Sequence, residues 1–459
     1  MNKIRDEDVV NGILAKGPYY TSYPTLNMWM KSDDYSKERG LLLEGLNGLP
    51  QQDVSIYIHI PFCTKICWYC ICNVKISKNR DKINLFFQHL IKEIEMIKSL
   101  LIDKDISINV RELHIGGGTP ASISNSQFNT LIDCLSQIIE FEKLDDFAVE
   151  IDPRVTTPDL LRFYASVGVD RISLGIQDFN NETQEEINRI QPINSVKKLL
   201  SNEVRSLFKS INFDLLYGLP NQTIETFNNT IHQVVSTFKP NRIALLKYAH
   251  VPDIRSHMKL INSDHLPSKS DLPHIFLNAV DYLCEHGYAR IGIDNFALSG
   301  DSLYAANKNK TIGRDFNGWT SRKINSSLAF GPSSTGLIDG FYYKNVTNLD
   351  KYYGLIDSGK LPFESYYSLT TSDKIRKHII FDLISNNFVD YKEYEALYGI
   401  QISIYFAKEL QIIKSQYNKF ITFSKGSLKI NNSGVSLSRN IALTFDAYNR
   451  DVEYSIVGP

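Results

Sequence analysis

The segment YIHIPFCTKICWYCICN, residues 57–73, holds four of the chain's six cysteines, namely Cys63, Cys67, Cys70 and Cys72. Thiolates this close together suit a soft, multi-iron centre, because one compact loop can wrap a cluster while the flanking chain supplies apolar walls. If the first three hold a four-iron cluster, its fourth iron stays open for a small chelating molecule, as a catalytic metal site keeps one position free. The segment therefore predicts an iron–sulfur centre with a chemical task.

Zinc and disulfide bonds are the alternatives for these sulfurs. Tetrahedral zinc sites usually draw paired ligands from two separated knuckles, and nothing elsewhere in the sequence pairs with this loop. Disulfides are disfavoured because the chain begins MNKIRDEDVVNG, with acidic residues and no apolar signal segment, which indicates a reducing cytosol. Cys134 and Cys284 fall in helical patterns, and we interpret them as small buried apolar residues.

Length and composition bound the class of protein. The 459 residues, 43% of them hydrophobic, can bury a large core and predict one big domain with one or two smaller ones. The net charge of −1 gives no electrostatic case for nucleic acid or an acidic membrane surface. No uncharged run approaches the roughly eighteen apolar residues that a membrane helix needs. We therefore expect a cytoplasmic protein that binds neither nucleic acid nor a membrane.

Short apolar strands alternate with amphipathic helices from about residue 54 to residue 294. Each strand is followed by a helical crossover, so the sheet should be parallel. The pattern predicts an α/β fold with a complete or partial βα barrel of the TIM type, whose ligand chemistry lies at the carboxyl ends of the strands. The expected strands are residues 54–60, 112–117, 147–152, 171–176, 211–218, 242–248 and 289–294, and the expected helices include 80–100, 125–140, 157–167 and 222–238.

Polar and glycine motifs follow several of these strands. Gly116, Gly117 and Gly118 stand just before Thr119 and Pro120. Three glycines remove side chains where a ligand lies against the backbone, and they permit the positive φ angles that expose amide N–H groups. Other strand ends carry Glu150, Gln177, Asp178 and Asp214, and each carboxylate alone could be a helix N-cap. Together, around one rim, they favour a cofactor site.

Longer motifs occur along the chain: YTSYPT at 20–25, YIHIPFC at 57–63, LHIGGGTP at 113–120, VEIDPR at 149–154, SLGIQDF at 173–179, NFDLLYGLP at 212–220 and FDAYNR at 445–450. Together they resemble the oxygen-independent coproporphyrinogen III dehydrogenase (HemN-like) family of radical S-adenosylmethionine (SAM) enzymes. The resemblance covers nearly the whole chain, and the C-x3-C-x2-C-x-C loop with GGGTP downstream is specific for this group. Related haem chaperones generally lack the cysteine that Cys72 supplies, so a haem-binding chaperone is a disfavoured alternative.

The resemblance implies the cofactors and the residues that hold them. Cys63, Cys67 and Cys70 would ligate a [4Fe-4S] cluster whose open iron chelates SAM, and Cys72 would be a cysteine that does not ligate iron. Family members bind a second SAM beside the first, so two SAM molecules are expected. The positions that match SAM contacts are Tyr57, Tyr69, Gly117, Gly118, Thr119, Glu150, Gln177, Arg189, Asp214 and Ala249.

The implied reaction is the anaerobic oxidative decarboxylation of coproporphyrinogen III propionates to vinyl groups, giving protoporphyrinogen IX in haem biosynthesis. The substrate side departs from the family pattern, because Tyr19 stands where an arginine precedes YTSYPT. A substrate with four propionates needs cationic partners, and Lys247, Arg322 and Lys323 are candidates to compensate. Substrate or lid candidates are Tyr19, Tyr20, Phe316, Asn317 and Thr335.

These departures keep an alternative open. Relatives on the same scaffold are methyltransferases or cyclopropanases that use the second SAM as a one-carbon donor for a natural-product substrate. Either enzyme would need a reductant protein such as flavodoxin or ferredoxin and a small-molecule substrate, and we expect a monomer.

The last part of the chain, from about residue 365, changes character. Helical patterns at 371–386 and 401–415 precede a hairpin, KFITFSKGSLKI, and a final helix around 437–450. This unit resembles a winged-helix-like domain, but its helices lack a basic stripe, so lid or packing duty is expected instead of DNA binding. We therefore divide the chain into an N-terminal lid (1–50), a radical SAM barrel core (51–300), a barrel-completing region (301–364) and a mostly helical C-terminal domain (365–459).

Overall fold

The structure is a computed structural model in which residues 6–15 and 17–448 are described. The chain divides into two compact units. One, here called the barrel unit, consists of Trp29–Asp214 and Ile324–Leu369. The other, the terminal unit, consists of Met1–Met28, Leu215–Lys323 and Thr370–Pro459. The division into lid, core, completing region and C-terminal domain stays a prediction.

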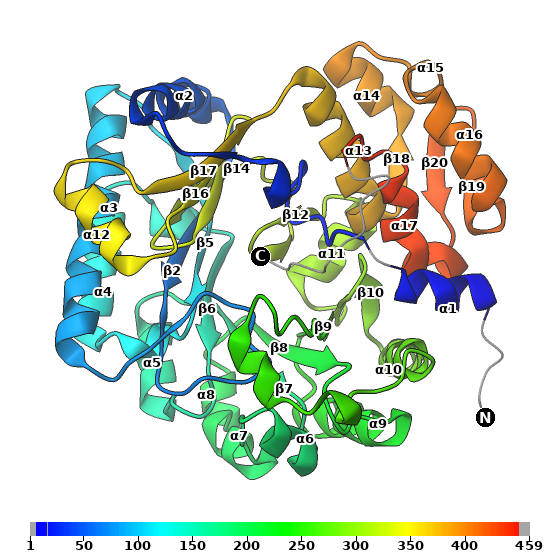
Figure 1. The fold of residues 1–459 in the computed structure, drawn as a ribbon, viewed down its shortest axis with the longest axis horizontal. Helices are drawn as coiled ribbons and strands as arrows, with labels where there is room; N and C mark the ends of the chain where they lie inside the picture. Colours follow the sequence, from blue (N-terminus) through cyan, green and yellow to red (C-terminus); the bar gives the residue numbers. More distant parts are fainter. Residues whose placement is uncertain (1–5, 16, 449–459) are drawn as a thin grey trace. The chain divides into compact units, whose positions relative to one another are not determined.

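Parallel strands form the centre of the barrel unit, in the order β14-β2-β5-β6-β7-β8 (Figure 1). Residue pairing is parallel from β14 to β2, from β2 to β5, from β5 to β6 and from β6 to β7. The strands are apolar on both faces, as expected where helices cover a parallel sheet. Their bounds are β2 Asp53–Ile60, β5 Asn109–Gly117, β6 Asp146–Ile151, β7 Arg171–Gln177, β8 Ser210–Tyr217 and β14 Ser326–Phe330.

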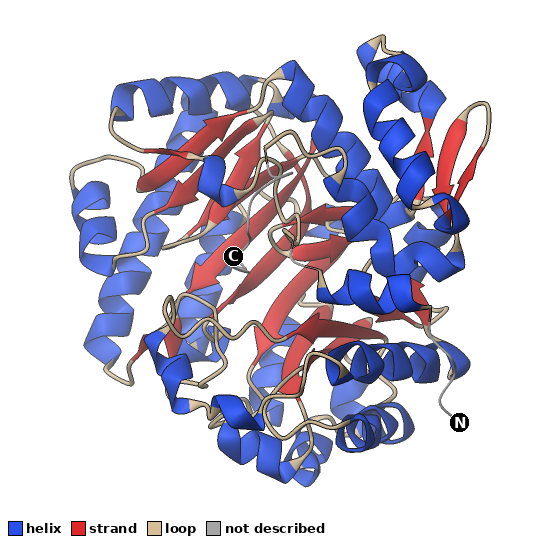
Figure 2. Ribbon diagram, turned by 45° about the vertical axis from the view of Figure 1, so that its right-hand side comes forward, coloured by secondary structure: helices blue, strands red, loops and turns tan. Residues whose placement is uncertain are grey.

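Amphipathic helices make the crossovers between these strands and pack along the sheet (Figure 2). Their starts follow side-chain caps, such as Asn79 on the amide of Lys82 and Thr157 on the amide of Leu160. The expected alternation of strand and helix is therefore present from β2 to β8. The helices are α3 Arg80–Asp103, α4 Asn125–Leu135, α5 Pro158–Ser166, α6 Asn181–Glu186, α7 Ile193–Leu199 and α8 Asn202–Arg205.

Antiparallel strands extend the sheet beyond β14, in the order β1-β17-β16-β15-β14. The helix α12 (Leu349–Asp357) connects β16 to β17 in the chain. Its Tyr352 is buried in a small core with Val346 and Ile356. The helix α2 (Tyr35–Asn47) begins at the N-cap Asp34. The strands are β1 Met30–Lys31, β15 Thr335–Ile338, β16 Phe341–Asn345 and β17 Phe363–Ser368.

One strand predicted in the terminal unit is wrong. Residues 289–294 were expected to form a further parallel strand, but β10 covers only Ala289–Ile291 and the chain then reverses into β11, Asn295–Ala297. The turn includes Gly292, whose φ of +53° is left-handed, a conformation that glycine adopts without steric cost. β11 then pairs antiparallel with β9, Arg242–Lys247. The apolar pattern was read correctly as strand, but it did not reveal the reversal.

Helices and short strands make up the remainder of the terminal unit. The helix expected at 371–386 is confirmed as α13, Thr371–Asn386, and the expected hairpin is present as β19 and β20, with β18 as a third strand. The predicted last helix is shorter than expected: α17 spans Ser438–Leu443, and residues 449–450 lie outside the described residues. The other α-helices and strands are α1 Glu7–Leu14, α9 Ile224–Gln233, α10 Asp271–Glu285, α11 Ser302–Asn309, β12 Gly313–Asp315, β13 Gly318–Thr320, β18 Phe388–Asp390, α14 Tyr391–Tyr398, α15 Ile402–Tyr405, α16 Ala407–Gln416, β19 Ile421–Phe423 and β20 Ser427–Ile430.

The helices of the described part of the chain differ from a membrane-spanning helix in length or hydropathy. Within residues 6–15 and 17–448, none of the helices combines the length and apolar character that a membrane-crossing helix requires.

Candidate functional site

The cysteine loop leaves the carboxyl end of β2 and is tied down at both ends. After Pro61 the chain forms β3, Phe62–Cys63, which pairs in parallel with β4, Lys75–Ile76. The amide of Ser77 donates to the carbonyl of Cys63 at 3.0 Å. A second anchor joins the middle of the loop to the end of α6, where the amide of Trp68 donates to the carbonyl of Ile187 at 3.0 Å. Backbone hydrogen bonds thus hold the cysteine loop at its ends and in its middle.

The thiols of this loop lie near one another. Burial raises the pKa of the Cys63 thiol to about 12, and the neighbouring Cys70 and Cys67 add to the shift. A hydrogen bond links the thiols of Cys70 and Cys72. Cys67 is buried, Cys63 and Cys70 are half-buried, and Cys72 is exposed. Three convergent soft donors on one loop fit an iron–sulfur cluster, and binding requires their deprotonation.

Two arginines and an aspartate surround the buried thiol of Cys67. The Nη1 of Arg189 donates to the Sγ of Cys67 at 3.4 Å, and its Nη2 donates to the carbonyl of Gly175 at 2.6 Å. Asp152 joins this guanidinium, at 3.4 Å, to that of Arg154, at 2.6 Å. Although burial opposes it, Arg189 and Arg154 lower the pKa of Asp152 to about 2. Two guanidinium groups and one carboxylate thus lie beside the cysteine loop.

The glycine motif forms the end of β5 and packs closely on the cysteine loop. Gly117 has a φ of +114°, and a Cβ there would meet the ring of His59 at 2.8 Å. A Cβ on Gly118 would meet the carbonyl oxygen of Phe62 at 2.6 Å. The amide of Thr119 donates to that carbonyl at 2.8 Å, while the buried Thr119 hydroxyl has no hydrogen-bond partner within the described residues. The glycines are therefore required for contact between β5 and the loop, and the Thr119 hydroxyl remains available to a ligand.

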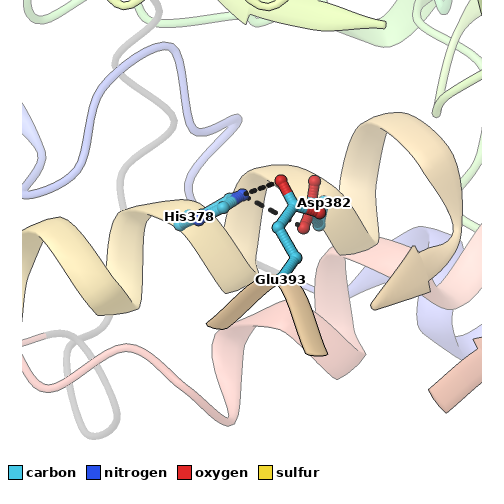
Figure 3. Close-up of side chains that lie close together, drawn as sticks. All are labelled: His378, Asp382 and Glu393. Atoms are coloured by element: carbon cyan, nitrogen blue, oxygen red, sulfur yellow. Dashed lines mark ion pairs between the residues drawn. The ribbon is translucent and has the colours of Figure 1, made fainter. Parts of the chain in front are cut away.

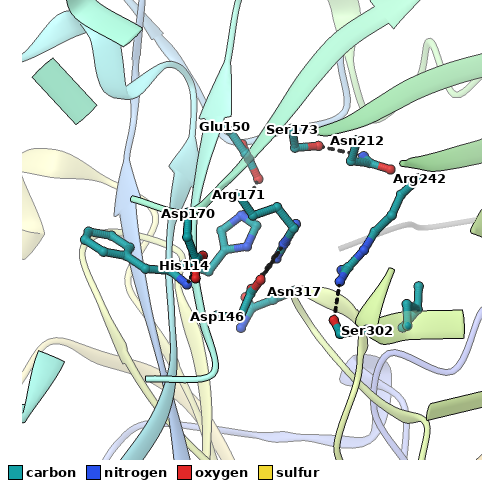
Figure 4. A network of polar contacts seen from close by, with 12 residues as sticks. His114, Asp146, Glu150, Asp170, Arg171, Ser173, Asn212, Arg242, Ser302 and Asn317 are labelled. Carbon is teal, nitrogen blue, oxygen red and sulfur yellow. Dashed lines mark hydrogen bonds and ion pairs between the residues drawn. The ribbon is translucent and has the colours of Figure 1, made fainter. Parts of the chain in front are cut away.

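Glu150, at the end of β6, is held by the neighbouring strand β5. Its Oε1 lies 3.1 Å from the Nε2 of His114, and its Oε2 accepts from the amide of Gly117 at 2.9 Å (Figure 4). Although burial opposes it, the hydrogen bond from His114 lowers the pKa of Glu150. The carboxylate is therefore ionised and oriented at neutral pH. His114 was not among the residues predicted from the sequence, although it lies within the LHIGGGTP motif.

Asp214, on β8, lies in a second polar group of the barrel unit. Its Oδ2 accepts from the hydroxyl of Ser173 at 3.0 Å, and its Oδ1 accepts from the side-chain amide of Asn212 at 2.7 Å. Asn212 also donates to Ser173 at 2.8 Å, as Figure 4 shows. Burial raises the pKa of Asp214 to about 6, and the charge of Glu150 adds to it. This carboxylate therefore changes its protonation near neutral pH.

Three further predicted residues flank these groups. Tyr57 donates from its hydroxyl to the Nδ1 of His59 at 3.1 Å, and the Nε2 of His59 donates to the carbonyl of Asn73 at 3.0 Å. Gln177 ends β7 with a φ of +66°. Tyr69 is near both Arg189 and Cys67. Burial raises the pKa of Tyr69 well above its usual value, although the charge of Arg189 opposes this shift. Gln177 therefore ends a strand and Tyr69 lies on the cysteine loop, whereas Tyr57 lies within β2 and Arg189 lies between α6 and α7.

Other candidates are placed differently. Thr335 begins β15 in the barrel unit, whereas Ala249, Tyr19, Tyr20, Phe316 and Asn317 belong to the terminal unit. Tyr20 is 1% exposed and donates from its hydroxyl to Asp446 at 2.9 Å, so packing accounts for its side chain. The amide of Asn317 donates to Asp315 at 2.7 Å in the turn between β12 and β13.

A separate cluster of possible metal ligands lies on α13 and α14 of the terminal unit. The Nε2 of His378 is 3.4 Å from Asp382 and 3.3 Å from Glu393 (Figure 3). The ammonium of Lys323 lies 2.8 Å from Asp382 and 3.5 Å from Glu393. Because the ammonium of Lys323 contacts both carboxylates, the cluster is an ion-pair network. It also removes Lys323 from the cations that were candidates for substrate binding.

Comparison with known proteins identifies relatives over almost the full length. The radical SAM superfamily model matches residues 57–234. The chain is 33% identical over 439 residues to the "Oxygen-independent coproporphyrinogen III oxidase" of Helicobacter pylori strain 26695, covering 95% of each protein. It is 32% identical over 435 residues to the protein of the same name from Escherichia coli K12, covering 95% of this chain and 93% of that one.

A solved structure gives the same result for the fold. The structure described as "Coproporphyrinogen III oxidase (HemN) from Escherichia coli is a Radical SAM enzyme" matches with a TM-score of 0.89 and 30% identity, over 98% of this chain and 100% of that chain. The predicted α/β fold with a barrel-like core of parallel strands is confirmed, as is the resemblance drawn from the motifs.

Proposed function

Because the chain belongs to the oxygen-independent coproporphyrinogen III oxidase family of radical SAM enzymes, we propose that it converts propionate groups of coproporphyrinogen III to vinyl groups without oxygen. Each round would remove one hydrogen from the β-carbon, then CO2 and one electron, and two rounds would yield protoporphyrinogen IX. The observation that carries the proposal is the similarity to proteins of that name over about the whole chain, including the cysteine loop.

The cluster would be held by Cys63, Cys67 and Cys70. When bound, the cluster and SAM supply a 5′-deoxyadenosyl radical able to take hydrogen from an unactivated carbon. The thiols converge on one loop, and the guanidinium of Arg189 donates a hydrogen bond to the Sγ of Cys67 at 3.4 Å. The exposed Cys72 is assigned no iron in this proposal.

SAM binding would fall to the strand ends around this loop. Two SAM molecules are proposed. Thr119 offers a buried hydroxyl that lacks a partner within the described residues, and Glu150 offers an ionised carboxylate suited to an amine. Asp214 would accept hydrogen bonds from ribose hydroxyls, and Arg189 would pair with a cofactor carboxylate. The remaining proposed contacts are Tyr57, Tyr69, Gly117, Gly118, Gln177 and Ala249.

The alternative, a methyltransferase or cyclopropanase, is not favoured by the relatives that match the whole chain. It differs in its products, because transfer of a methyl-derived carbon from the second SAM releases S-adenosylhomocysteine. For either reaction we propose a small-molecule substrate, a flavodoxin or ferredoxin as reductant, and a monomeric enzyme.

An anaerobic assay tests the proposal. Reconstituted enzyme is incubated with dithionite, SAM and coproporphyrinogen III, and the products are analysed for vinyl porphyrins, 5′-deoxyadenosine and S-adenosylhomocysteine. We expect vinyl products with 5′-deoxyadenosine from the wild type and neither from Cys63→Ala. Formation of 5′-deoxyadenosine without vinyl products would refute the substrate assignment. A methylated product accompanied by S-adenosylhomocysteine would establish the alternative.

A further inference from the structure

Two arginines of the terminal unit are directed at Tyr19 from different elements. Arg314, on β12, donates from Nη2 to the carbonyl of Tyr19 at 3.2 Å, and its guanidinium stacks on the ring of Trp319 at 4.3 Å. Arg439, on α17, has its guanidinium carbon 5.4 Å from the centre of the Tyr19 ring. Its Nη2 donates to the carbonyl of Ala15 at 2.6 Å. Neutral acceptors and aromatic rings thus hold both guanidinium groups in place.

Two more cations complete the group. Lys247, the last residue of β9, has its backbone amide beside the hydroxyl of Tyr19, and it lies close enough to Arg439 for the two charges to repel. Arg290 is the second. Its charge acts on Tyr217, which the charges of Arg439 and Tyr19 also influence. Its own hydrogen bonds go to the carbonyl of Ile293 at 2.6 Å and the hydroxyl of Ser436 at 2.9 Å.

The charges of this group do not balance. Within residues 6–15 and 17–448, no ion pair of 4.0 Å or less joins any of the four cations to a carboxylate. The one acidic side chain that acts on Tyr19 is Asp294, whose Oδ1 accepts from the indole of Trp319 at 2.9 Å, and whose buried Oδ2 has no hydrogen-bond partner within those residues. Asp294 and Asp315 both act on Arg314 through their charges, so four positive charges face two negative ones, and no close ion pair among the described residues joins them.

Other cations of the same unit are paired with carboxylates. Arg242 lies 2.7 Å from the carboxylate of Asp301, and Lys323 lies 2.8 Å from that of Asp382. An uncompensated charge inside a protein is costly, so cations without carboxylate partners need another reason to be there. Burial lowers the pKa of Lys247 and of Arg314, and for Arg314 it outweighs the charges of Asp294 and Asp315. A negatively charged ligand would remove this imbalance.

We propose that Lys247, Arg314 and Arg439 form a binding site for the carboxylates of an anionic substrate, with the Tyr19 hydroxyl as a further donor. Tyr19, Lys247, Arg314 and Arg439 are all half-buried residues. Planar guanidinium groups bind carboxylates through paired hydrogen bonds, and a lysine adds a point charge. The choice of a propionate-bearing substrate rests on the proposed function, whereas the site itself rests on the charges.

Two probes separate these claims. Coproporphyrin III is the oxidised form of the proposed substrate, carries the same four carboxylates and does not turn over, and its binding to anaerobic holoenzyme is followed by porphyrin fluorescence. Pyromellitate, benzene-1,2,4,5-tetracarboxylate, is a polycarboxylate without a porphyrin ring, and its binding is measured by calorimetry. For both we expect affinity to fall as KCl is raised, and the tetramethyl ester of coproporphyrin III should bind more weakly than the free acid.

Variants then assign the binding to the site. Lys247→Gln and Arg439→Gln should each weaken both probes about tenfold, because each removes a charged hydrogen bond. Arg439→Lys keeps the charge and should restore part of the affinity. Lys392→Gln, at an exposed position of α14, is the matched control and should bind like the wild type. Iron content and circular dichroism establish that each variant is folded.

The outcomes are distinct for the two claims. If the two glutamine variants bind both probes within twofold of the wild type, or lose no more affinity than Lys392→Gln, the site is refuted while the proposed function stands. If wild type binds neither probe, the site is likewise refuted. If pyromellitate binds and is weakened by the variants but coproporphyrin III does not bind, the anion site stands and the proposed substrate is refuted.

Discussion

Glu93 of α3 should make the stability of the protein depend on pH. Its side chain is 2% exposed. Its Oε2 accepts from the backbone amide of Gly331 at 2.7 Å and from the hydroxyl of Tyr352 at 2.6 Å. Its Oε1 accepts from the side-chain amide of Asn345 at 2.6 Å. No cation is among these partners. Burial raises its pKa to about 7, against the three hydrogen bonds, which lower it.

The magnitude follows from linkage. With an unfolded pKa of 4.5 and a folded pKa of about 7, ionising Glu93 costs the native state about 3 kcal/mol, at about 1.4 kcal/mol for each pKa unit. Because the folded pKa is the higher one, the contribution is fully present below pH 4.5 and is lost as the pH rises through 7. Glu93→Gln cannot ionise, so its free energy of unfolding should lack this dependence.

Urea unfolding of wild type and Glu93→Gln between about pH 5 and pH 8.5, followed by circular dichroism, measures the effect. The difference in unfolding free energy should shift by roughly 2–3 kcal/mol in favour of the variant as the pH rises across this range. Glu44→Gln, at an exposed position of α2, controls for the loss of a carboxylate. A difference that stays constant with pH would show that Glu93 is already ionised in the fold, and the reasoning from burial would be wrong.

Three other changes test the cofactor site. Cys63→Ala should abolish the brown colour and SAM cleavage of anaerobically reconstituted protein, whereas Cys72→Ala should keep about four irons per chain; loss of the iron in the second variant would mean that the ligands are misassigned. Gly117→Ala should lower SAM affinity more than tenfold in an equilibrium titration, because the added Cβ would lie 2.8 Å from the ring of His59 at a φ of +114°. SAM affinity should fall as the pH drops through about 6, where Asp214 becomes protonated, and Asp214→Asn should bind weakly at every pH; a wild-type affinity that is flat from pH 5 to 8 would contradict this role.

The strands of the fold were predictable because parallel strands buried on both faces leave continuous apolar runs. The expected strand at 54–60 is β2, Asp53–Ile60, and the expected strand at 171–176 is β7, Arg171–Gln177. The strand expected at 289–294 failed, because a short apolar run has the same pattern whether its partner is parallel or antiparallel. Gly292 is the residue that marks the reversal, and a single glycine inside a strand pattern is a weak signal.

The candidate site was only partly predictable. The cysteine spacing is local, so the sequence displays it directly, whereas the contact between Arg189 and Cys67 joins residues 122 apart and depends on the fold. Asp152 and Arg154 stand in the VEIDPR motif beside Glu150, so the motif itself contains the signal for them. His114 belongs to the LHIGGGTP motif in the same way. Its contact with Glu150, however, depends on the register of β5 and β6, in which His114 lies opposite Ala148.

Tyr19 shows why a motif position alone is a poor guide to substrate charge. Its replacement of the expected arginine counted against a substrate with propionates. In the structure, however, Arg314 and Arg439 approach Tyr19 from β12 and α17, so positive charge is supplied to that place by residues remote in the sequence. Binding of a carboxylate depends on the charges that converge in space, and one position can lose its cation when two neighbours provide theirs. The departure at Tyr19 therefore does not argue against an anionic substrate, and the balance of charge around it argues for one.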